Sequence, residues 1–483
     1  MHDLEPIATA RYHKVPLTNV KLWEPCSPDE AVDWPECFEA EDADFEPYPV
    51  KPIPYQESSA PLLYVIIHPD GGIWLEGSLY LFERITELGT KATTASNIAG
   101  DLSNFMNTLL TGCRDFLDFD GPSFQRPTYY YKSELKKLLI KRELKRSTAN
   151  RKILSMVGFY RWLCATRNFK PKQEMWKDKV RNVRYLDRHG IQQSKEIRGT
   201  DLTFRSAESI STGQYISDGG KLSPISRENQ KHLLATLVAL GNPEMILIHI
   251  VALTTGMRIQ SILTLRHACI KQGKGGPNDP SKYALYGIKI GEGTLVEAKR
   301  GKPQTVLMPA WVHYKLSIYL NSERHKERAM RSAIKNEDDQ YLFLTRTGRP
   351  YYTAEADQEA FDYSSEKGSA IRQYLKTIGE KLNEMGANFR YQFHDLRATF
   401  GMNLIEDNMK HVENGKMNQL ELLDLLKNRL NQEDINTALG YLKYREGNEL
   451  VAYAQSDFED HLQSVITTEM LRHENIRTKL LSS

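Results

Sequence analysis

The segment Leu253–Leu265, LTTGMRIQSILTL, carries the most informative pattern in this 483-residue sequence. An apolar stretch from Met245 to Thr254 has the character of a buried helix, and Gly256 interrupts it before Arg258 opens a second apolar helical run. By itself, an arginine in that place is ordinarily a surface or capping residue. The segment gains meaning from two partners farther along the chain.

A second segment, Phe393–Phe400 with the sequence FHDLRATF, pairs a histidine with an arginine. His394 and Arg397 are three residues apart, which places them on one face of a helix. A third segment, Ala438–Tyr441 (ALGY), is followed by two more tyrosines. Each of these patterns is weak when it is taken alone.

The sequence between the first two segments predicts a small sheet and several helices. Strands are expected at Tyr283–Ile290, Thr294–Ala298 and Thr305–Met308, and a turn containing Lys299 joins the last two. Helices are expected around Trp311–Arg331, Tyr374–Glu384, Leu396–Asn408 and Leu420–Leu430. This half of the chain therefore reads as mainly helical with one small sheet.

Together, and in this order, the three segments resemble the motif boxes of the tyrosine recombinase, or phage integrase, family. Glu297–Lys302 (EAKRGK) resembles the β-hairpin that carries the family's lysine, and Tyr341–Gly348 resembles the segment before the second box. The resemblance extends from about Ala92 to Gln455. It implies a mainly α fold with small β-sheets, in which a helical core-binding domain precedes a mixed α/β catalytic domain.

The resemblance implies DNA cleavage and rejoining through a 3′-phosphotyrosyl intermediate, with no metal and no cofactor. Arg258 and Arg397 would hold the non-bridging oxygens of the phosphodiester bidentately, a task that other nucleases assign to metal ions. His394 would donate to the same phosphate or help to deprotonate the nucleophile. Lys299 would protonate the departing 5′ oxygen as a general acid.

Three tyrosines compete for the part of the nucleophile. In the family, the nucleophile usually follows the phosphate-contacting residue of the third box by nine positions. Tyr453 follows Tyr444 by nine residues and Tyr441 by twelve, so both registers select Tyr453, with Tyr441 as the phosphate contact. Residues 450–454 read as a short helix after a flexible turn at 446–448. The structural alternative is that Tyr453 packs against its own domain.

Two positions depart from the family pattern. Ser261 stands where the family usually has an acidic residue that supports the active site, and Tyr441 stands where it has His or Trp. These departures indicate a divergent member. They also leave open a DNA-binding accessory protein of the same fold that has lost strand cleavage. A type IB topoisomerase and a structural helical protein with coincidental motifs are further alternatives.

A basic tract precedes the catalytic half of the chain. Between residues 132 and 152, nine basic residues are offset by only Glu134 and Glu143. We expect these side chains to bind DNA phosphates, although a charge run of this kind is often only a solvated helix face. The nine residues are Lys132, Lys136, Lys137, Lys141, Arg142, Lys145, Arg146, Arg151 and Lys152.

The segregation of charge, rather than the net charge of +2, outlines the domains. The expected order is an acidic N-terminal arm with a possible β unit (1–90), a helical core-binding domain (91–190), a linker (191–222), the catalytic domain (223–455) and a helical tail (456–483). The arm lacks Lys and Arg from Leu22 to Val50 and would repel DNA. Within it, Leu62–Ile67 and Ile73–Leu81 are expected to form two strands joined by a turn.

Composition bounds the class of protein. The N-terminus does not read as a signal peptide and no stretch approaches a membrane span, so we expect a cytoplasmic, nucleoid-associated protein. The five scattered cysteines predict reduced, mostly buried thiols rather than disulfides or a zinc site. The expected partners are double-stranded DNA, three further copies of the chain in a tetramer on paired sites, and an accessory protein bound by the arm.

Overall fold

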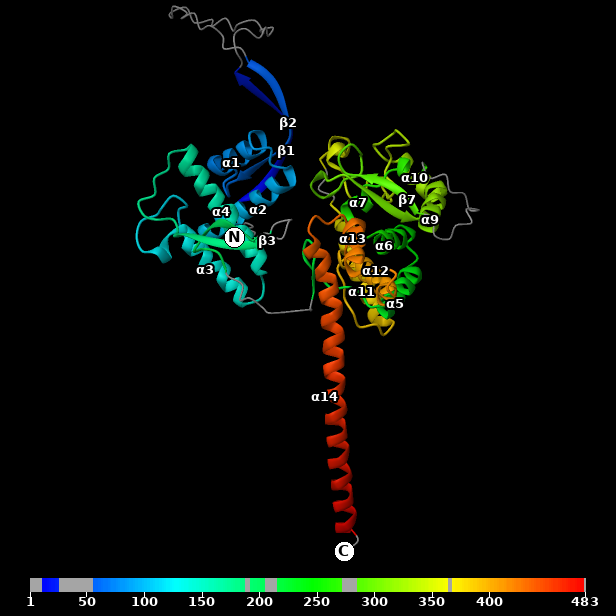
Figure 1. Ribbon diagram of the computed structural model, residues 1–483. Helices are drawn as coiled ribbons and strands as arrows, with labels where there is room; N and C mark the ends of the chain where they lie inside the picture. Colours follow the sequence, from blue (N-terminus) through cyan, green and yellow to red (C-terminus); the bar gives the residue numbers. More distant parts are fainter. Residues whose placement is uncertain are drawn as a thin grey trace, which may run out of the picture. The chain divides into compact units, whose positions relative to one another are not determined.

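The computed structural model describes residues 11–25, 55–186, 192–204, 215–271, 285–363 and 367–481. The chain divides into two compact units, Met1–Ser209 and Ile210–Ser483 (Figure 1). Both are mainly helical with small two-stranded sheets, which confirms the predicted fold class. Among the described helices, none combines the length and apolarity that crossing a membrane requires.

In the first unit, two antiparallel hairpins accompany a group of helices. Strand β1 (His13–Pro25) pairs with β2 (Tyr55–Ile67), and β3 (Asp178–Leu186) pairs with β4 (Gln192–Thr200). The helices are α1 (Leu75–Thr86), α2 (Ala92–Thr111), α3 (Pro127–Ile140) and α4 (Arg146–Thr166), with a short 3-10 turn, η1 (Ser123–Gln125). The apolar faces of α2 and α4 form the core, as their periodicity predicts.

One strand prediction in this unit is wrong. Leu62–Ile67 belongs to β2, but Ile73–Leu81 is not a strand, because Leu75–Thr86 forms α1. The buried side chains Trp74, Ser78 and Leu81 recur every three to four residues, which is the period of a helix. The partner of β2 is instead β1, from the segment expected to be an extended arm.

The segment predicted to be a linker contains regular structure. Residues 191–222 include β4 and a second short hairpin, β5 (Ile216–Ser217) with β6 (Lys221–Leu222), rather than only a polar connection. Most of the acidic segment, from residue 26 onward, lies outside the described residues, as do Cys26 and Cys37. The three described cysteines are free, but Cys113 is exposed and the other two are only partly buried.

The second unit surrounds a nearly all-apolar helix, α6 (Pro243–Thr255), whose buried residues join the main core. Its β-hairpin pairs β7 (Leu285–Ile290) with β8 (Gln304–Pro309), and the predicted third strand at Thr294–Ala298 is a loop instead. The remaining helices are α5 (Arg227–Leu240), α7 (Ile259–Leu263), α8 (His267–Lys271), α9 (Ala310–Asn321), α10 (Glu323–Met330), α11 (Ser369–Glu384), α12 (Asp395–Glu413), α13 (Gln419–Leu430) and α14 (Ile435–Leu481).

Helix ends in this unit follow the local sequence. Gly241 closes α5 in the left-handed conformation, at φ 65°, and the Asn242 side chain accepts a hydrogen bond from the Met245 N–H at the start of α6. Pro243 occupies the first turn of α6, where its missing N–H is not needed. The sequence Gly-Asn-Pro thus separates two helices, as predicted.

The last helix, α14, runs without interruption for 47 residues (Figure 1). The predicted turn at residues 446–448 is therefore wrong, because one glycine costs a helix only about 1 kcal/mol and its neighbours favour helix. The first turns of α14 bury Ala438, Tyr441 and Leu442 against α12 and α13. From Glu459 to Met470, every described side chain is exposed.

Candidate active site

The first arginine of the site is placed by a glycine. Gly256 ends α6 at φ 66°, and Arg258 then caps the start of α7. A Cβ on Gly256 would lie 2.6 Å from Phe400 Cδ1 and 2.8 Å from Leu430 Cδ2, so no larger residue fits without displacing core side chains. The Arg258 side chain remains 24% exposed.

The second arginine is buried, and each nitrogen of its guanidinium group donates a hydrogen bond. Arg397, in the first turn of α12, donates from Nε to Asp218 Oδ2 at 2.8 Å, from Nη1 to the Gly256 carbonyl at 2.7 Å and from Nη2 to the Leu430 carbonyl at 2.6 Å. The two carbonyls lie at the C-terminal ends of α6 and α13, where the helix dipoles favour a cation. Three acceptors thus fix the plane of this guanidinium group.

Asp218, in the turn of the β5–β6 hairpin, receives hydrogen bonds from the three motif segments that contain Arg258, Arg397 and Tyr441. Besides Arg397, its carboxylate accepts from Arg258 Nη2 at 3.4 Å, Gln432 Nε2 at 3.0 Å and Tyr441 Oη at 3.4 Å. Its backbone carbonyl accepts from His394 Nε2 at 3.0 Å. Residues separated by more than 200 positions therefore meet around one buried carboxylate.

His394 and Lys299 approach the same hairpin from another side. A Cβ on Gly219, which has a φ of 71°, would lie 3.1 Å from Lys299 Nζ and 3.8 Å from His394 Nε2. Glycine therefore lets the ammonium and the imidazole come close to the turn. Burial, together with the charges of the neighbouring arginines, lowers the pKa of His394, which keeps the imidazole neutral near pH 7.

Tyr441 is completely buried beneath the arginines. A Cβ on Gly401 of α12 would lie 2.4 Å from Tyr441 Cε1, so the absence of a side chain there creates the space for the ring. Burial and the nearby Asp218 carboxylate raise the pKa of the phenol well above its ordinary value. Tyr441 is therefore a neutral hydrogen-bond donor in this site.

A basic cavity of about 270 Å³ opens beside these groups. Cationic side chains from four separate segments line it, and Ser261 lies on its wall. The cations are Arg258, Lys299, Arg300, Lys302, Arg397 and Arg429. A cavity of this composition suits an anion such as a phosphodiester.

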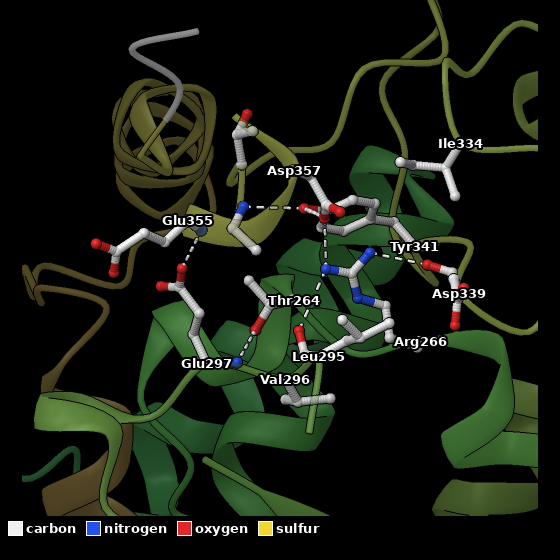
Figure 2. Close-up of polar contacts among 12 residues, drawn as sticks. Thr264, Arg266, Leu295, Val296, Glu297, Ile334, Asp339, Tyr341, Glu355 and Asp357 are labelled. Carbon is white, nitrogen blue, oxygen red and sulfur yellow. Dashed lines mark hydrogen bonds and ion pairs between the residues drawn. The ribbon is translucent and has the colours of Figure 1, made fainter. Parts of the chain in front are cut away.

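Glu297 connects the loop that carries Lys299 to helix α7, which begins directly after Arg258. Its backbone N–H donates to Thr264 Oγ1 at 2.9 Å, and its carboxylate accepts a hydrogen bond from the Glu355 N–H (Figure 2). The carboxylate also accepts a hydrogen bond from Gln260 of α7. Glu297 stands two residues before Lys299, and Gln260 stands two residues after Arg258. The two catalytic candidates are thus linked through one carboxylate.

Beside this loop, Arg266 forms a buried anchor (Figure 2). Its guanidinium group donates to Asp357 Oδ2 at 2.6 Å, to the Asp339 carbonyl at 2.8 Å and to the Leu295 carbonyl at 3.2 Å. It also lies 3.7 Å from the centre of the Tyr341 ring. Arg266 therefore connects Tyr341 and Asp357 to the loop at Leu295 that leads to Lys299.

Tyr453, the predicted nucleophile, lies on α14, and its side chain is outside the described part of the structure. It follows Tyr441 by twelve residues on an unbroken helix, so the two backbones are about 18 Å apart along the helix axis. Tyr444 is partly buried and packs against the α12–α13 core. Of these three tyrosines, the structure brings Tyr441 to the arginines.

The nine basic residues of the first unit fall into two groups. Four are engaged within the protein: Lys132 donates to the Asp201 carbonyl, Lys137 pairs with Glu134, Arg151 pairs with Asp101, and Lys152 donates to Asn104. The other five are exposed, and within the described residues they form no ion pair. These five are Lys136, Lys141, Arg142, Lys145 and Arg146.

Several solved structures align with most of this chain at low sequence identity. A Tn1549 transposon integrase bound to transposon right end DNA aligns with a TM-score of 0.40 at 13% identity, covering 78% of this chain and 99% of that one. The same integrase with a circular intermediate DNA gives 0.42 at 13%, covering 76% and 94%. A crystal structure of XerA recombinase gives 0.29 at 16%, covering 78% and 97%.

The chain is similar to an integrase and a recombinase. That is the kind of protein that its motifs resemble. No family model and no curated protein matches the sequence. At such identities and TM-scores, the matches say nothing of activity, and the inference of function rests on the site itself.

Sequence reasoning missed Asp218 and Gln432, which contact the arginine cluster, and Arg429, which lines the cavity. Asp218 stands in a segment that was expected to be a linker, and its partners follow it by 40 to 223 residues. No local pattern marks such a contact. The one available signal was the pair Gly219-Gly220 directly after an aspartate, which is typical of a tight turn.

Proposed function

We propose that this chain is a tyrosine recombinase that cuts and rejoins DNA strands in the integration, excision or transposition of a mobile element. One observation carries the proposal: Arg258, Arg397 and Lys299 line a single basic cavity, and His394 contacts the Asp218 carbonyl at the cavity's edge. Six cations but only three carboxylates, Asp218, Glu433 and Asp434, line this cavity, and such an excess of positive charge around an open cavity is typical of a functional site rather than of a purely structural one.

The proposed step is a transesterification. The oxygen of a tyrosine attacks the phosphorus, the P–O bond to the 5′ oxygen breaks, and a 3′-phosphotyrosyl bond forms. The arginines offset the charge that develops on the non-bridging oxygens, and Lys299 gives its proton to the leaving 5′ oxygen. His394 donates from Nε2, so its neutral ring can accept the phenol proton at Nδ1. Rejoining reverses each transfer.

We assign the attack to Tyr453, which cannot reach the arginines from an unbroken α14 of the same chain, given the axial separation of about 18 Å. Either α14 opens between Tyr441 and Tyr453, where Gly447 is the weakest helix former, or Tyr453 enters from a second copy of the chain. The second route makes cleavage depend on assembly of at least two copies of the chain on DNA.

The first unit is assigned the larger part of DNA binding, through the five exposed cations of α3 and α4 and the turn between them. Assembly of four copies on paired DNA sites, an accessory protein bound by the acidic arm and association with the nucleoid complete the proposal. The reaction itself draws on no metal and no cofactor.

Trapping the covalent intermediate tests the proposal. A nicked suicide substrate, whose short 5′ fragment diffuses away after cleavage, should leave DNA attached to the full-length protein in buffer that contains EDTA. The adduct is read as a protease-sensitive shift on a denaturing gel. A strict requirement for Mg²⁺ would contradict the metal-free mechanism. DNA binding with no adduct from any substrate would identify the accessory protein instead.

Reversal of the exposed cations should weaken DNA binding and flatten its salt dependence. Each phosphate contact contributes about 0.9 to the slope of log K against log salt, so changing Lys136, Lys141, Arg142 and Lys145 to Glu should reduce that slope by roughly 3 to 4. The slope is measured by fluorescence anisotropy over a salt series. Glutamine at the same four positions is the matched control and should reduce affinity less. An unchanged slope would show that the tract is only a solvated surface.

Removal of the exposed end of α14 should impair assembly rather than folding. The end carries an exposed apolar row of Leu462, Val465, Ile466 and Met470, at near-helical spacing. Truncation after Gln455 should leave the melting temperature nearly unchanged but abolish the synaptic complex of paired sites in a gel-shift assay. Synapsis by the truncated protein would refute the assigned role.

A further inference from the structure

Asp218 is the most heavily hydrogen-bonded carboxylate of the candidate site. Its side chain is 5% exposed and that of Arg397 is 4% exposed, so the two charges meet away from water. The Oδ2 atom accepts from Arg397, Gln432 and Tyr441, while Oδ1 accepts from Arg258. Buried carboxylates are rarely found without such compensation.

The hairpin that carries Asp218 is anchored on both sides of the turn. Ile216 and Leu222 are 1% and 3% exposed and belong to the core formed by α12, α13 and α14. Directly after the hairpin, the Ser223 N–H donates to Asp395 Oδ1 at 3.0 Å and the Ile225 N–H donates to Thr399 Oγ1 at 2.9 Å. These contacts make Asp218 a fixed part of the second unit.

The electrostatics show what Asp218 does for the two arginines. Burial lowers the pKa of Arg258, and the charge of Arg397 lowers it further, whereas Asp218 opposes both effects. Burial acts to raise the pKa of Asp218, but Arg397, Gln432 and Arg258 together bring it below its ordinary value. The carboxylate is therefore ionised, and it offsets the mutual repulsion of two guanidinium groups held in one pocket.

We propose that Asp218 is a positioning residue, which holds both guanidinium groups in the orientation in which they line the phosphate cavity. This inference rests on the proposed function. Asp218 itself touches no reacting atom in it, because the carboxylate binds Arg397 through Nε and Arg258 through one Nη atom. Besides the three hydrogen bonds that Arg397 donates, each of its Nη atoms has a second N–H, and both arginines line the cavity.

A single substitution distinguishes a positioning role of Asp218 from a role in which its carboxylate blocks the phosphate site. Asp218→Asn keeps the shape of the side chain and removes its charge, so the arginines should lose their orientation. We expect single-turnover adduct formation at saturating DNA to fall about 100-fold, which is the scale of losing one preorganised donor, with DNA affinity nearly unchanged. Asp218→Glu, which restores the charge on a longer side chain, should recover part of the rate.

The matched control is Asp407→Asn, which removes the carboxylate of an exposed ion pair with Arg227 in the same unit and should cleave like the unmodified chain. An unchanged rate in Asp218→Asn would overturn the proposal. A raised rate would also overturn it, because it would mean that the carboxylate occupies the place of the phosphate and blocks the site.

A stability measurement tests the contact without any cleavage. Melting temperatures are compared for Asp218→Asn, Arg397→Lys and the double variant. If Asp218 orients Arg397, the decrease in the double variant should be clearly smaller than the sum of the single decreases, because both remove the same interaction. Additive decreases would overturn the proposal. An unmodified chain that forms no adduct but shows this coupling would contradict the proposed function and leave the contact intact.

Discussion

Replacement of Arg258 by alanine is expected to reduce DNA cleavage by at least 100- to 1000-fold, on the order of the loss of one preorganised donor to transition-state charge. Its side chain lines the cavity and is the more exposed of the two arginines, so its removal should disturb the fold little. Most DNA affinity should remain, because binding is assigned chiefly to the first unit. Adduct formation and DNA affinity are measured on the same preparation.

Arg397→Lys should be as severe for cleavage. A lysine can satisfy only one direction of the three in which Arg397 now donates, and it leaves carbonyls of Gly256 and Leu430 without their partner. The control is Arg227→Ala, an exposed arginine of the same unit that pairs with Glu406 and Asp407. If Arg258→Ala cleaves at the rate of the unmodified chain, the cavity is not the site of the reaction.

Tyr453→Phe should abolish the covalent adduct completely while retaining DNA binding, because no other group would then form the phosphotyrosyl bond. Tyr444→Phe should still form an adduct. Tyr441→Phe should form one more slowly, since it removes only a hydrogen-bond donor beside the arginines. Mass spectrometry of the trapped adduct identifies the attached tyrosine, and attachment at Tyr441 or Tyr444 would show that the assignment is wrong.

Mixing two inactive variants distinguishes the routes by which Tyr453 reaches the phosphate. Arg258→Ala supplies an intact tyrosine, and Tyr453→Phe supplies an intact cavity. If the nucleophile comes from a second copy of the chain, the mixture should form an adduct on the Arg258→Ala protein. If α14 opens within one chain, the mixture should stay as inactive as its components.

The sequence predicted most of the architecture because its strongest signals are local. The Gly-Asn-Pro break before α6 and the apolar spacing of α4 and α12 were sufficient to place those helices. The order of the motifs was sufficient to gather Arg258, His394 and Arg397, which lie together in the structure. The helices could be placed because a short stretch of chain determines each one. The three site residues could be grouped because their motifs occur in the order found in a known family.

The misreadings have a common physical origin in signals that compete or act at long range. Ile73–Leu81 is rich in strand-forming residues, yet its buried positions follow a helical period. The glycine at 447 suggested a turn, but its cost of about 1 kcal/mol is outweighed by the helix-forming residues around it. Asp218 could not be found, because a carboxylate in a polar hairpin becomes part of a site only through distant partners.

The unbroken path of α14 has a consequence for the timing of the reaction. Tyr441 at its buried start, Tyr453 at its middle and the apolar row near its end all lie on one continuous rod of about 70 Å. A partner that binds the apolar row would therefore also set the position of Tyr453, the proposed nucleophile. Under the proposed function, a single chain bound at an isolated DNA site should therefore not cleave it when the nucleophile comes from a second copy.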